Sequence, residues 1–336
     1  MKMNKLFVVL LLGTIFLMSC GKPTVPESLN PGGDGGYKIV SRLSTTGYAQ
    51  DVIKKDNMVY IAQGEGGLMI VDVSLPSNPL VASITTKKVR GYSSRIEMKD
   101  SVAYLAAGGF GVTVVDVADP FAPFVTVSNS QMKPAKSLHI FGSYIIVGLS
   151  EQGFIISNIS NPSYPFTCDD TEVPGYAQGI NTTADSTLLL VACGEVGLSI
   201  FDISNFQEGY GIYPLINTCD TRGYANDVII DDESIAYLAC GTAGLQIIDF
   251  SDTAYVYVIG SYDGDGYAKD LMLKNNKIYL AAEKGGLQII DVSDPTNPTL
   301  LGIVETEYAL GFDMDDKYIY LADEEEGLII ISIPNQ

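Results

Sequence analysis

The 336-residue chain lacks several residues and motifs on which enzyme chemistry commonly depends. It contains no tryptophan and a single histidine, His139. One histidine excludes the zinc motif H-E-x-x-H, which needs two on one helix face. No G-x-S-x-G elbow occurs, and no glycine-rich segment is followed by Lys-Ser or Lys-Thr. A nucleophile elbow and a phosphate-binding P-loop are therefore excluded as well.

Basic residues are also scarce. The chain has 20 Lys and Arg against 40 Asp and Glu, a formal net charge of −20. Such a chain repels phosphate backbones, so we expect no nucleic-acid partner. A solvated acidic surface favours solubility and attracts cationic partners or ions. Apolar residues make up 46% of the chain, which is enough for a packed core.

Five cysteines are present, without a C-x-x-C pair or the spacing of metal ligands. Cys193 and Cys240 occupy the same place in successive repeats, within Ala-Cys-Gly each time. Equivalent positions of neighbouring repeats lie too far apart to form a disulfide. We expect Cys168, Cys193, Cys219 and Cys240 to be buried free thiols. Cys20 belongs to the N-terminal segment described next.

The N-terminal segment indicates export. Lys2 and Lys5 precede an apolar stretch over residues 6–18, which is too short to span a ~30 Å hydrocarbon core. It ends in Leu-Met-Ser-Cys20, which resembles the lipobox of bacterial lipoproteins. The resemblance implies that residues 1–19 are removed as a signal peptide and that Cys20 is lipidated. An ordinary signal peptide or a short anchor is the alternative.

Residues 20–36 are rich in Pro and Gly, which predicts a flexible tether behind the lipid. Membrane contact is then expected through the N-terminal lipid only. Gly21 stands where inner-membrane retention signals often place Asp. By resemblance to enterobacterial sorting, this favours the outer membrane, with the protein periplasmic or surface-exposed.

An internal repeat dominates the rest of the chain. Gly-Tyr-Ala or a near relative recurs at intervals of 41–48 residues, with a degenerate copy at Lys133-Pro134-Ala135. This makes seven units, at a period near that of β-propeller blades. The tyrosines of the other six copies are Tyr48, Tyr92, Tyr176, Tyr224, Tyr267 and Tyr308.

Each unit predicts four strands, which in the first unit cover residues 51–53, 59–62, 68–73 and 80–84. The third is almost continuously apolar, which is typical of a strand covered on both faces. An aspartate recurs near its end, where its carboxylate can accept N–H bonds from the following turn. We interpret these as structural, with metal binding as the alternative: Asp72, Asp116, Asp202, Asp249 and Asp291.

The apolar run at residues 68–73, followed by Ser-x-Pro-x-x-Pro, resembles the LVIVD repeat of bacterial and archaeal cell-surface proteins. The resemblance covers residues 37–334 and implies a propeller-type fold and a surface location, but no settled biochemical activity. The third unit departs from the pattern, with Pro134 in place of Tyr and Asn158 in place of Asp.

The two ends of the repeat region complement each other. The last unit stops after its third strand, whereas Tyr37 to Leu43 reads as a fourth strand with no first three. If this segment completes the last unit, the sheets close into a ring and leave no open edge. We therefore predict an all-β, seven-bladed, monomeric propeller over residues 37–336. An open solenoid is the alternative.

Topology also predicts a functional face. With successive strands antiparallel, the second-to-third hairpins and the fourth-to-first connections emerge on one side. This side gathers the six tyrosines and the hairpin acids, where aromatic rings bordered by carboxylates could stack sugars or dock basic side chains. Alternatively, each tyrosine packs against the neighbouring blade. The candidate acids are Glu65, Glu195 and Glu283, with Glu151 and Glu324 to Glu326.

The favoured function is a non-enzymatic binding or scaffolding module at the cell envelope, which recognises a protein or a glycan and needs no cofactor. The alternative is a hydrolase or lyase with a metal or carboxylate site in the central channel. Its best candidates are Asp51, Asp227 and Asp270 on the inner strands. His139 replaces the isoleucine of other repeats and is interpreted as a tolerated strand residue.

Overall fold

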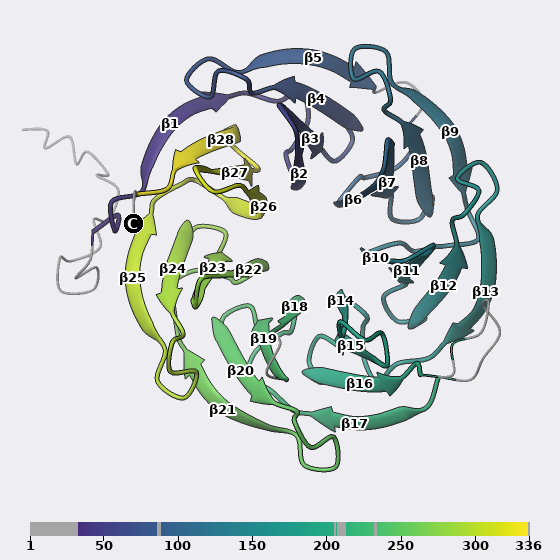
Figure 1. The fold of residues 1–336 in the computed structure, drawn as a ribbon, viewed down its shortest axis with the longest axis vertical. Coiled ribbons are helices and arrows are strands. Elements are labelled where there is room, and N and C mark those ends of the chain that lie inside the picture. The colour runs from purple at the N-terminus through teal and green to yellow at the C-terminus, as the bar shows by residue number, and fades with distance from the viewer. Residues whose placement is uncertain (1–32, 86–88, 205, 207–212, 232–233, 335–336) are drawn as a thin grey trace, which may run out of the picture.

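The computed structural model describes residues 33–85, 89–204, 206, 213–231 and 234–334, with residues 166–169 described in backbone only. Over these residues the strands form seven four-stranded antiparallel sheets, arranged as blades around a central channel (Figure 1). The prediction of an all-β, seven-bladed propeller is thus confirmed. The described part of the chain contains no helix that is long and apolar enough to span a bilayer.

The innermost strand of each blade comes first in the chain and the outermost last, except in blade 7. Blades 1 to 3 comprise β2 (Asp51–Lys55), β3 (Met58–Ala62), β4 (Leu68–Asp72) and β5 (Leu80–Thr85); β6 (Arg95–Lys99), β7 (Val102–Ala106), β8 (Val112–Asp116) and β9 (Phe124–Asn129); and β10 (Ser137–Phe141), β11 (Tyr144–Gly148), β12 (Phe154–Asn158) and β13 (Phe166–Thr171).

Blades 4 to 7 continue the order, and the strand that precedes blade 1 completes blade 7. Their strands are β14 (Gly179–Thr182), β15 (Leu188–Ala192), β16 (Leu198–Asp202) and β17 (Leu215–Cys219); β18 (Asp227–Ile230), β19 (Ile235–Ala239), β20 (Leu245–Asp249) and β21 (Tyr257–Tyr262); β22 (Asp270–Lys274), β23 (Lys277–Ala281), β24 (Leu287–Asp291) and β25 (Thr299–Val304); and β26 (Ala309–Met314), β27 (Tyr318–Asp323), β28 (Gly327–Ser332) and β1 (Lys38–Leu43).

The core lies between the blades. Each third strand is sandwiched between two neighbouring sheets, so the residues from Leu68 to Val71 in β4 are at most 1% exposed. One such interface packs Tyr320 and Leu328 of blade 7 against Val59 and Met69 of blade 1. Because apolar burial on both faces needs a neighbour on each side, the continuous apolar run of the third strand is explained by the ring.

The recurring aspartates have the structural role that their position predicts. Asp72 Oδ1 accepts a 2.8 Å hydrogen bond from the backbone N–H of Ser74. Hydrogen bonds of this kind stabilise the carboxylate and lower the pKa of Asp72. In the third unit, Asn158 accepts the same bond from Ser160. The other aspartates that accept it are Asp116, Asp202, Asp249 and Asp291.

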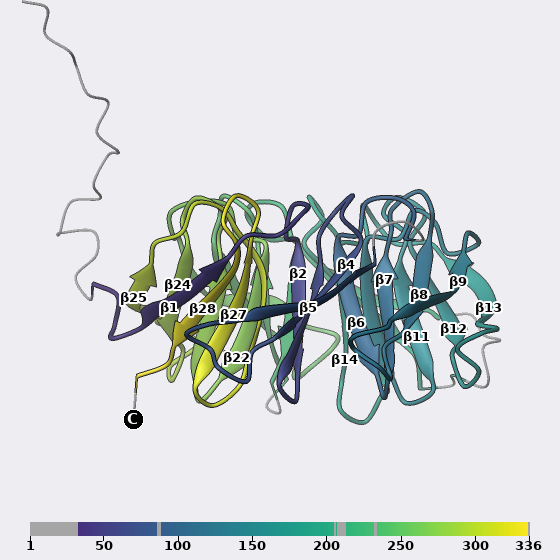
Figure 2. The same cartoon turned by 90° about the horizontal axis from the view of Figure 1, so that it is seen from above.

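The ring closes through the predicted N-terminal strand. β1 pairs antiparallel with β28, from Lys38 opposite Ser332 to Leu43 opposite Leu328 (Figures 1 and 2). Just before β1, the Tyr37 hydroxyl lies 3.0 Å from the Tyr279 hydroxyl in blade 6. Val40 and Leu43 of the same segment pack into the interface of blades 7 and 1. The segment from Tyr37 to Leu43 therefore completes blade 7 and connects it to both neighbouring blades, and the predicted completion of the last blade is confirmed.

The described cysteines are thiols. Cys193, Cys219 and Cys240 are buried and free, as expected. Burial raises the pKa of the Cys193 and Cys240 thiols to about 12. The signal peptide, most of the tether, Cys20 and the Cys168 side chain lie outside the described part, so the expectations about them remain predictions.

Candidate functional site

The Gly-Tyr-Ala segments and the second-to-third-strand hairpins lie together on one side of the ring, which we call the tyrosine face. In blades 1 to 6, a backbone bridge connects the hairpin to the Ala or Ser that follows the next tyrosine position. These bridges include Gly64 with Ser93, Gly194 with Ala225 and Gly241 with Ala268. The tyrosines at these positions are therefore fixed at a boundary between two blades.

The tyrosines pack against the neighbouring blade and also remain accessible. A Cβ added to the hairpin glycine would come within 2.8 Å of the next tyrosine ring, and each of these glycines has positive φ. This applies to Tyr92 over Gly64, Tyr224 over Gly194 and Tyr267 over Gly241. At the same time, Tyr92 is 39% exposed, and Tyr48 is 55% exposed. The packing and binding interpretations are thus compatible.

Between blades 7 and 1, the tyrosine face is hollowed into a cavity of about 600 Å³, which we call the acidic groove. Its lining includes Tyr48, Glu65, Glu324 and Glu325, with the short polar side chains of residues 44–46. Burial, and then the neighbouring acids Glu325, Glu283 and Asp323, raise the pKa of Glu324. The negative charges of this groove therefore repel one another.

The other candidate acids lie in different surroundings. Glu283 accepts a hydrogen bond from the Tyr308 hydroxyl, which together with burial raises the pKa of Tyr308 to about 12. Glu195 lies near Tyr224, in the sector where Tyr224 also neighbours Tyr176 and Tyr267. The predicted face is thus divided into sectors, and only one of them contains the acidic groove.

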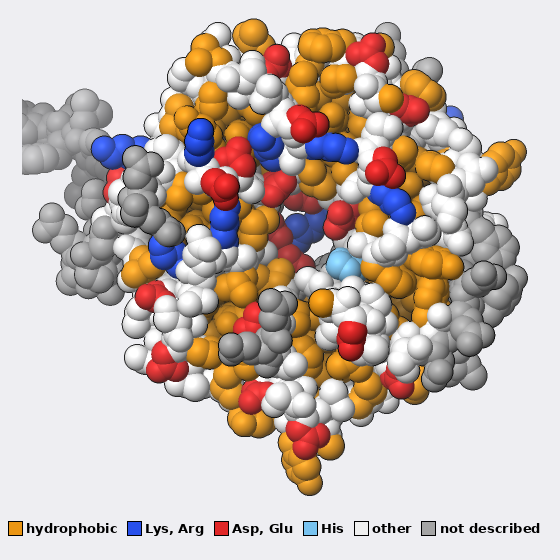
Figure 3. All heavy atoms as spheres, viewed as in Figure 1, with side chains coloured by type: hydrophobic (Ala, Val, Ile, Leu, Met, Phe, Trp, Pro, Cys, Tyr) orange, Lys and Arg blue, Asp and Glu red, His pale blue; other side chains and the backbone are white. Residues whose placement is uncertain are grey.

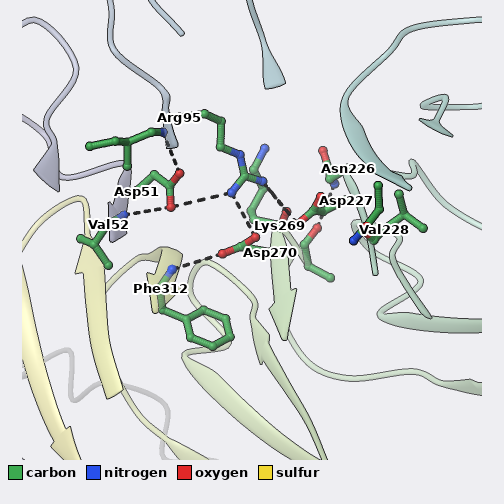
Figure 4. A network of polar contacts seen from close by, with 12 residues as sticks. Asp51, Val52, Arg95, Asn226, Asp227, Val228, Lys269, Asp270 and Phe312 are labelled. Atoms are coloured by element: carbon green, nitrogen blue, oxygen red, sulfur yellow. Dashed lines mark hydrogen bonds and ion pairs between the residues drawn. The ribbon is translucent and has the colours of Figure 1, made fainter. Parts of the chain in front are cut away.

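The three channel aspartates converge on one cation. The Arg95 guanidinium lies 3.0 Å from Asp270 Oδ1, 3.7 Å from Asp227 Oδ2 and 4.0 Å from Asp51 Oδ1 (Figure 4). Burial opposes its charge, but the three carboxylates outweigh burial and raise the Arg95 pKa above its usual value. Arg95 occupies the position between the carboxylates that a bound cation would take.

Two of these aspartates also bind backbone groups of the next blade. An innermost strand has no partner on its channel side, so its N–H groups on that side need side-chain acceptors. Asp51 Oδ2 accepts from the Ile96 N–H at 3.0 Å, and Asp270 Oδ2 accepts from the Phe312 N–H at 3.1 Å. These carboxylates therefore connect neighbouring blades as well as neutralising Arg95.

Strand register shows why the channel is asymmetric. Arg95 pairs with Ala106 just as Asp51, Asp227 and Asp270 pair with the corresponding Ala of their blades. At this position, blades 4 and 7 have Gly179 and Gly311. A Cβ on Gly179 would lie 2.5 Å from Asp227 Oδ1, so this glycine makes room for the carboxylate. The sequence therefore did contain a signal for the role of Arg95: this repeat position holds unlike residues in different blades, among them Asp, Arg and Gly.

The channel is wider on the side opposite the tyrosine face. A cavity of about 410 Å³ is lined there by Glu97, His139, Asn181 and Asp313. Arg95 and its three aspartates, which we call the Arg95 cluster, also line it. Figure 3 shows acidic and basic side chains gathered around this central opening. His139 lies on β10, where its Nε2 is 2.9 Å from Thr182 Oγ1, and burial lowers its pKa to about 4. Sequence reasoning missed the contribution of Glu97, His139, Asn181 and Asp313 to this cavity.

Carboxyl groups in the channel make stability depend on pH. Burial raises the pKa of Asp51 to about 7 and that of Glu97 to about 8, both above their unfolded values of 3.8 and 4.5. The folded protein therefore retains protons that the unfolded chain releases, and folding is disfavoured as pH rises between these values.

Among the described His, Cys, Asp and Glu residues, no group of three or more is arranged to hold a metal ion.

We expect the free energy of unfolding to fall between pH 5 and pH 8 by on the order of a few kcal/mol. Urea unfolding at pH 5, 6.5 and 8 measures this slope. The variant Asp51→Asn with Glu97→Gln should show a shallower decrease, because both groups then keep one charge state. A wild-type stability that rises over this interval would contradict the prediction.

Comparison with solved structures supports the fold. The chain is similar to the WD40 β-propeller domain of Doa1, with a TM-score of 0.71 at 11% identity over 89% of this chain and 98% of that one. It is also similar to a chain of a mitotic checkpoint complex, with a TM-score of 0.67 at 11% identity over 98% of this chain and 100% of that one. At such low identity, these similarities show the fold alone.

A computationally designed protein, Ika8, is similar as well, with a TM-score of 0.64 at 10% identity over 88% of this chain and 100% of that one. No curated protein matches the chain significantly.

The repeats themselves match a known family. The LVIVD repeat matches residues 46–86, 90–128, 134–169, 222–264, 265–306 and 313–336, which is more than half of the chain. The third unit is matched despite Pro134 and Asn158, whereas no match covers the fourth unit, with Tyr176 and Gly179. The chain therefore belongs to the LVIVD repeat family, as its recurring third-strand sequence predicted.

Proposed function

We propose that this protein is a non-enzymatic binding module of the cell envelope, and that its acidic groove binds a cationic segment of a partner protein. The observation that supports the proposal is that Tyr48 lines the acidic groove together with Glu65 of blade 1 and Glu324 and Glu325 of blade 7. A fold of LVIVD propeller type is suited to binding or scaffolding.

Electrostatics favours a protein partner with Lys or Arg over a neutral glycan. The raised pKa of Glu324 reflects burial and repulsion from other carboxylates, and a bound cation would relieve the repulsion. Tyr48 offers an exposed ring on which a guanidinium or ammonium group can stack. The net charge of −20 adds long-range attraction for the same kind of partner.

Binding of a fluorescent oligo-arginine peptide, measured by anisotropy, tests the proposal. We expect Tyr48→Ala and Glu324→Gln each to weaken binding by about three- to tenfold, which corresponds to the loss of one cation–π contact or one partly buried charge pair. The affinity should also decrease with added salt, because the attraction is electrostatic.

Glu151→Gln is the matched control. Glu151 is also an exposed hairpin acid on the tyrosine face, but it does not line the groove. If this control weakens binding as much as Glu324→Gln does, the peptide responds only to overall charge and the groove is not its site. Binding of neutral oligosaccharides, with no binding of the peptide, would favour a glycan partner instead.

The alternative, a hydrolase or lyase acting in the channel, has one observation in its favour. Asp51, Asp227 and Asp270 do converge, and Glu97 and Asp313 line the adjoining cavity. A metal at the aspartates would have to displace the Arg95 guanidinium, which supports this function less well. Metal analysis of the purified protein, with a thermal shift upon addition of Ca²⁺, Mg²⁺ or Zn²⁺, tests it.

A further inference from the structure

The mouth of the channel on the tyrosine face has the opposite charge to the groove beside it. A cavity of about 150 Å³, which we call the upper cavity, lies there directly above the Arg95 cluster. Its lining comes from the residues that follow the Gly-Tyr-Ala segments around the ring. They are Gln50, Ser94, Arg95, Lys136, Gln178, Asn226, Lys269 and Leu310, with no acidic residue among them.

Two lysines at this cavity have no carboxylate partner. Within the described residues, neither Lys136 nor Lys269 forms an ion pair within 4.0 Å. Burial, and then the nearby Arg95, lower the pKa of Lys269; Glu283 opposes this shift, and Lys136 adds to it. Three cations thus line one small cavity of a strongly acidic protein. Arg95 is paired with the channel aspartates, but Glu283 and Asp270 do not cancel the downward shift of the Lys269 pKa.

The upper cavity also contains an unsatisfied donor. The Gln50 side chain lines the cavity, and its Nε2 is buried without a hydrogen-bond partner. A buried N–H group that lacks an acceptor costs roughly 1–3 kcal/mol. If the Gln50 amide rotates toward an acceptor in the cavity, that acceptor removes this cost at the same time as it neutralises the lysines.

We propose that the upper cavity binds a small oxyanion, the carboxylate, sulfate or phosphate group of a ligand, between Lys136, Lys269 and the Gln50 amide. Charge-assisted hydrogen bonds from ammonium and amide groups are the interactions that such oxygens accept best. The cavity volume corresponds to about five water molecules in the liquid, at ~30 Å³ each, so it can hold one such group with ordered water. The proposal is independent of the acidic groove.

The test is calorimetric titration of the whole mature protein with sodium acetate, sulfate or phosphate, each at the same ionic strength set with sodium chloride. We expect at least one of the three to bind with a Kd in the millimolar range or tighter. The preferred anion distinguishes a carboxylate ligand from a sulfate or phosphate ligand. Lys136→Gln should weaken binding of that anion by about tenfold, the loss of one charge-assisted contact.

Lys284→Gln is the matched control, because it removes a positive charge from an exposed hairpin of the same face without lining the cavity. The affinity of the Lys284→Gln variant for the anion should remain within about twofold of wild type. Gln50→Met should weaken anion binding without lowering the melting temperature in anion-free buffer, since its donor has no partner there. Absence of binding by all three anions, or equal losses in Lys136→Gln and Lys284→Gln, would overturn the proposal.

Discussion

Deletion of residues 37–43 is expected to lower the free energy of unfolding more than any single substitution in the propeller. The deletion removes β1 and with it the whole ladder that pairs residues 38–43 with β28. It also removes Val40 and Leu43 from the interface of blades 7 and 1, and Tyr37 and Ile39 from the interface of blades 6 and 7.

We expect Tyr37 alone to account for much of this loss of stability. Tyr37 is 3% exposed, and its ring packs edge-to-face on Tyr279 with centroids 6.0 Å apart. Replacing a buried aromatic residue by Ala costs about 3–5 kcal/mol, so Tyr37→Ala should lower the melting temperature by roughly 10 °C. Tyr37→Phe should cost only about 1 kcal/mol, because it loses the hydroxyl contact and retains the packing.

Differential scanning calorimetry of the deletion and the Tyr37 variants measures these effects. Tyr255→Ala is the control, because Tyr255 is 74% exposed and should change stability by less than about 0.5 kcal/mol. A deletion variant as heat-resistant as the parent would show that β1 does not hold the ring closed.

Arg95→Met is expected to cost about 3–5 kcal/mol at pH 8, because it leaves buried carboxylates without their cation. The Arg95 side chain is 22% exposed, and its strongest partner, Asp270, is 11% exposed. Protonation of the carboxyl groups relieves the repulsion, so the loss should be smaller at pH 5. Urea unfolding of wild type and variant at both pH values measures the difference.

A second substitution separates electrostatics from packing. Combining Arg95→Met with Asp270→Asn should recover part of the lost stability, since one uncompensated charge disappears. Arg222→Met is the matched control: Arg222 also pairs with an aspartate, at 2.6 Å to Asp263, but this pair is exposed. Such surface pairs contribute about 0–1 kcal/mol. Equal losses for the two arginines would contradict the assigned role of Arg95.

Much of the fold could be predicted from the sequence because each blade is specified locally. The continuous apolar run in β4 requires a sheet on either side, and Asp72 marks the turn that follows it. Seven copies of the apolar run, five of them followed by Asp, and a lone fourth strand at Tyr37 to Leu43 then leave a closed ring as the arrangement without open edges. The structure confirms each of these steps.

The channel was less predictable, for a physical reason. Asp51, Asp227 and Asp270 stood out because they recur, whereas Arg95 occurs once at the same repeat position. A repeat analysis emphasises what the units share, but a site in the centre of a ring depends on how they differ. For the same reason the basic lining of the upper cavity, with Lys136 and Lys269, was not expected in an acidic chain.

By itself, the sequence determined the number of blades, the order of their strands and the segment that closes the ring, because these follow from short-range patterns at a fixed spacing. Only the tertiary structure decided which unlike side chains meet. Arg95 and Asp270 are 175 residues apart, and their 3.0 Å contact exists because seven sheets turn through a full circle and bring both inner strands to one axis.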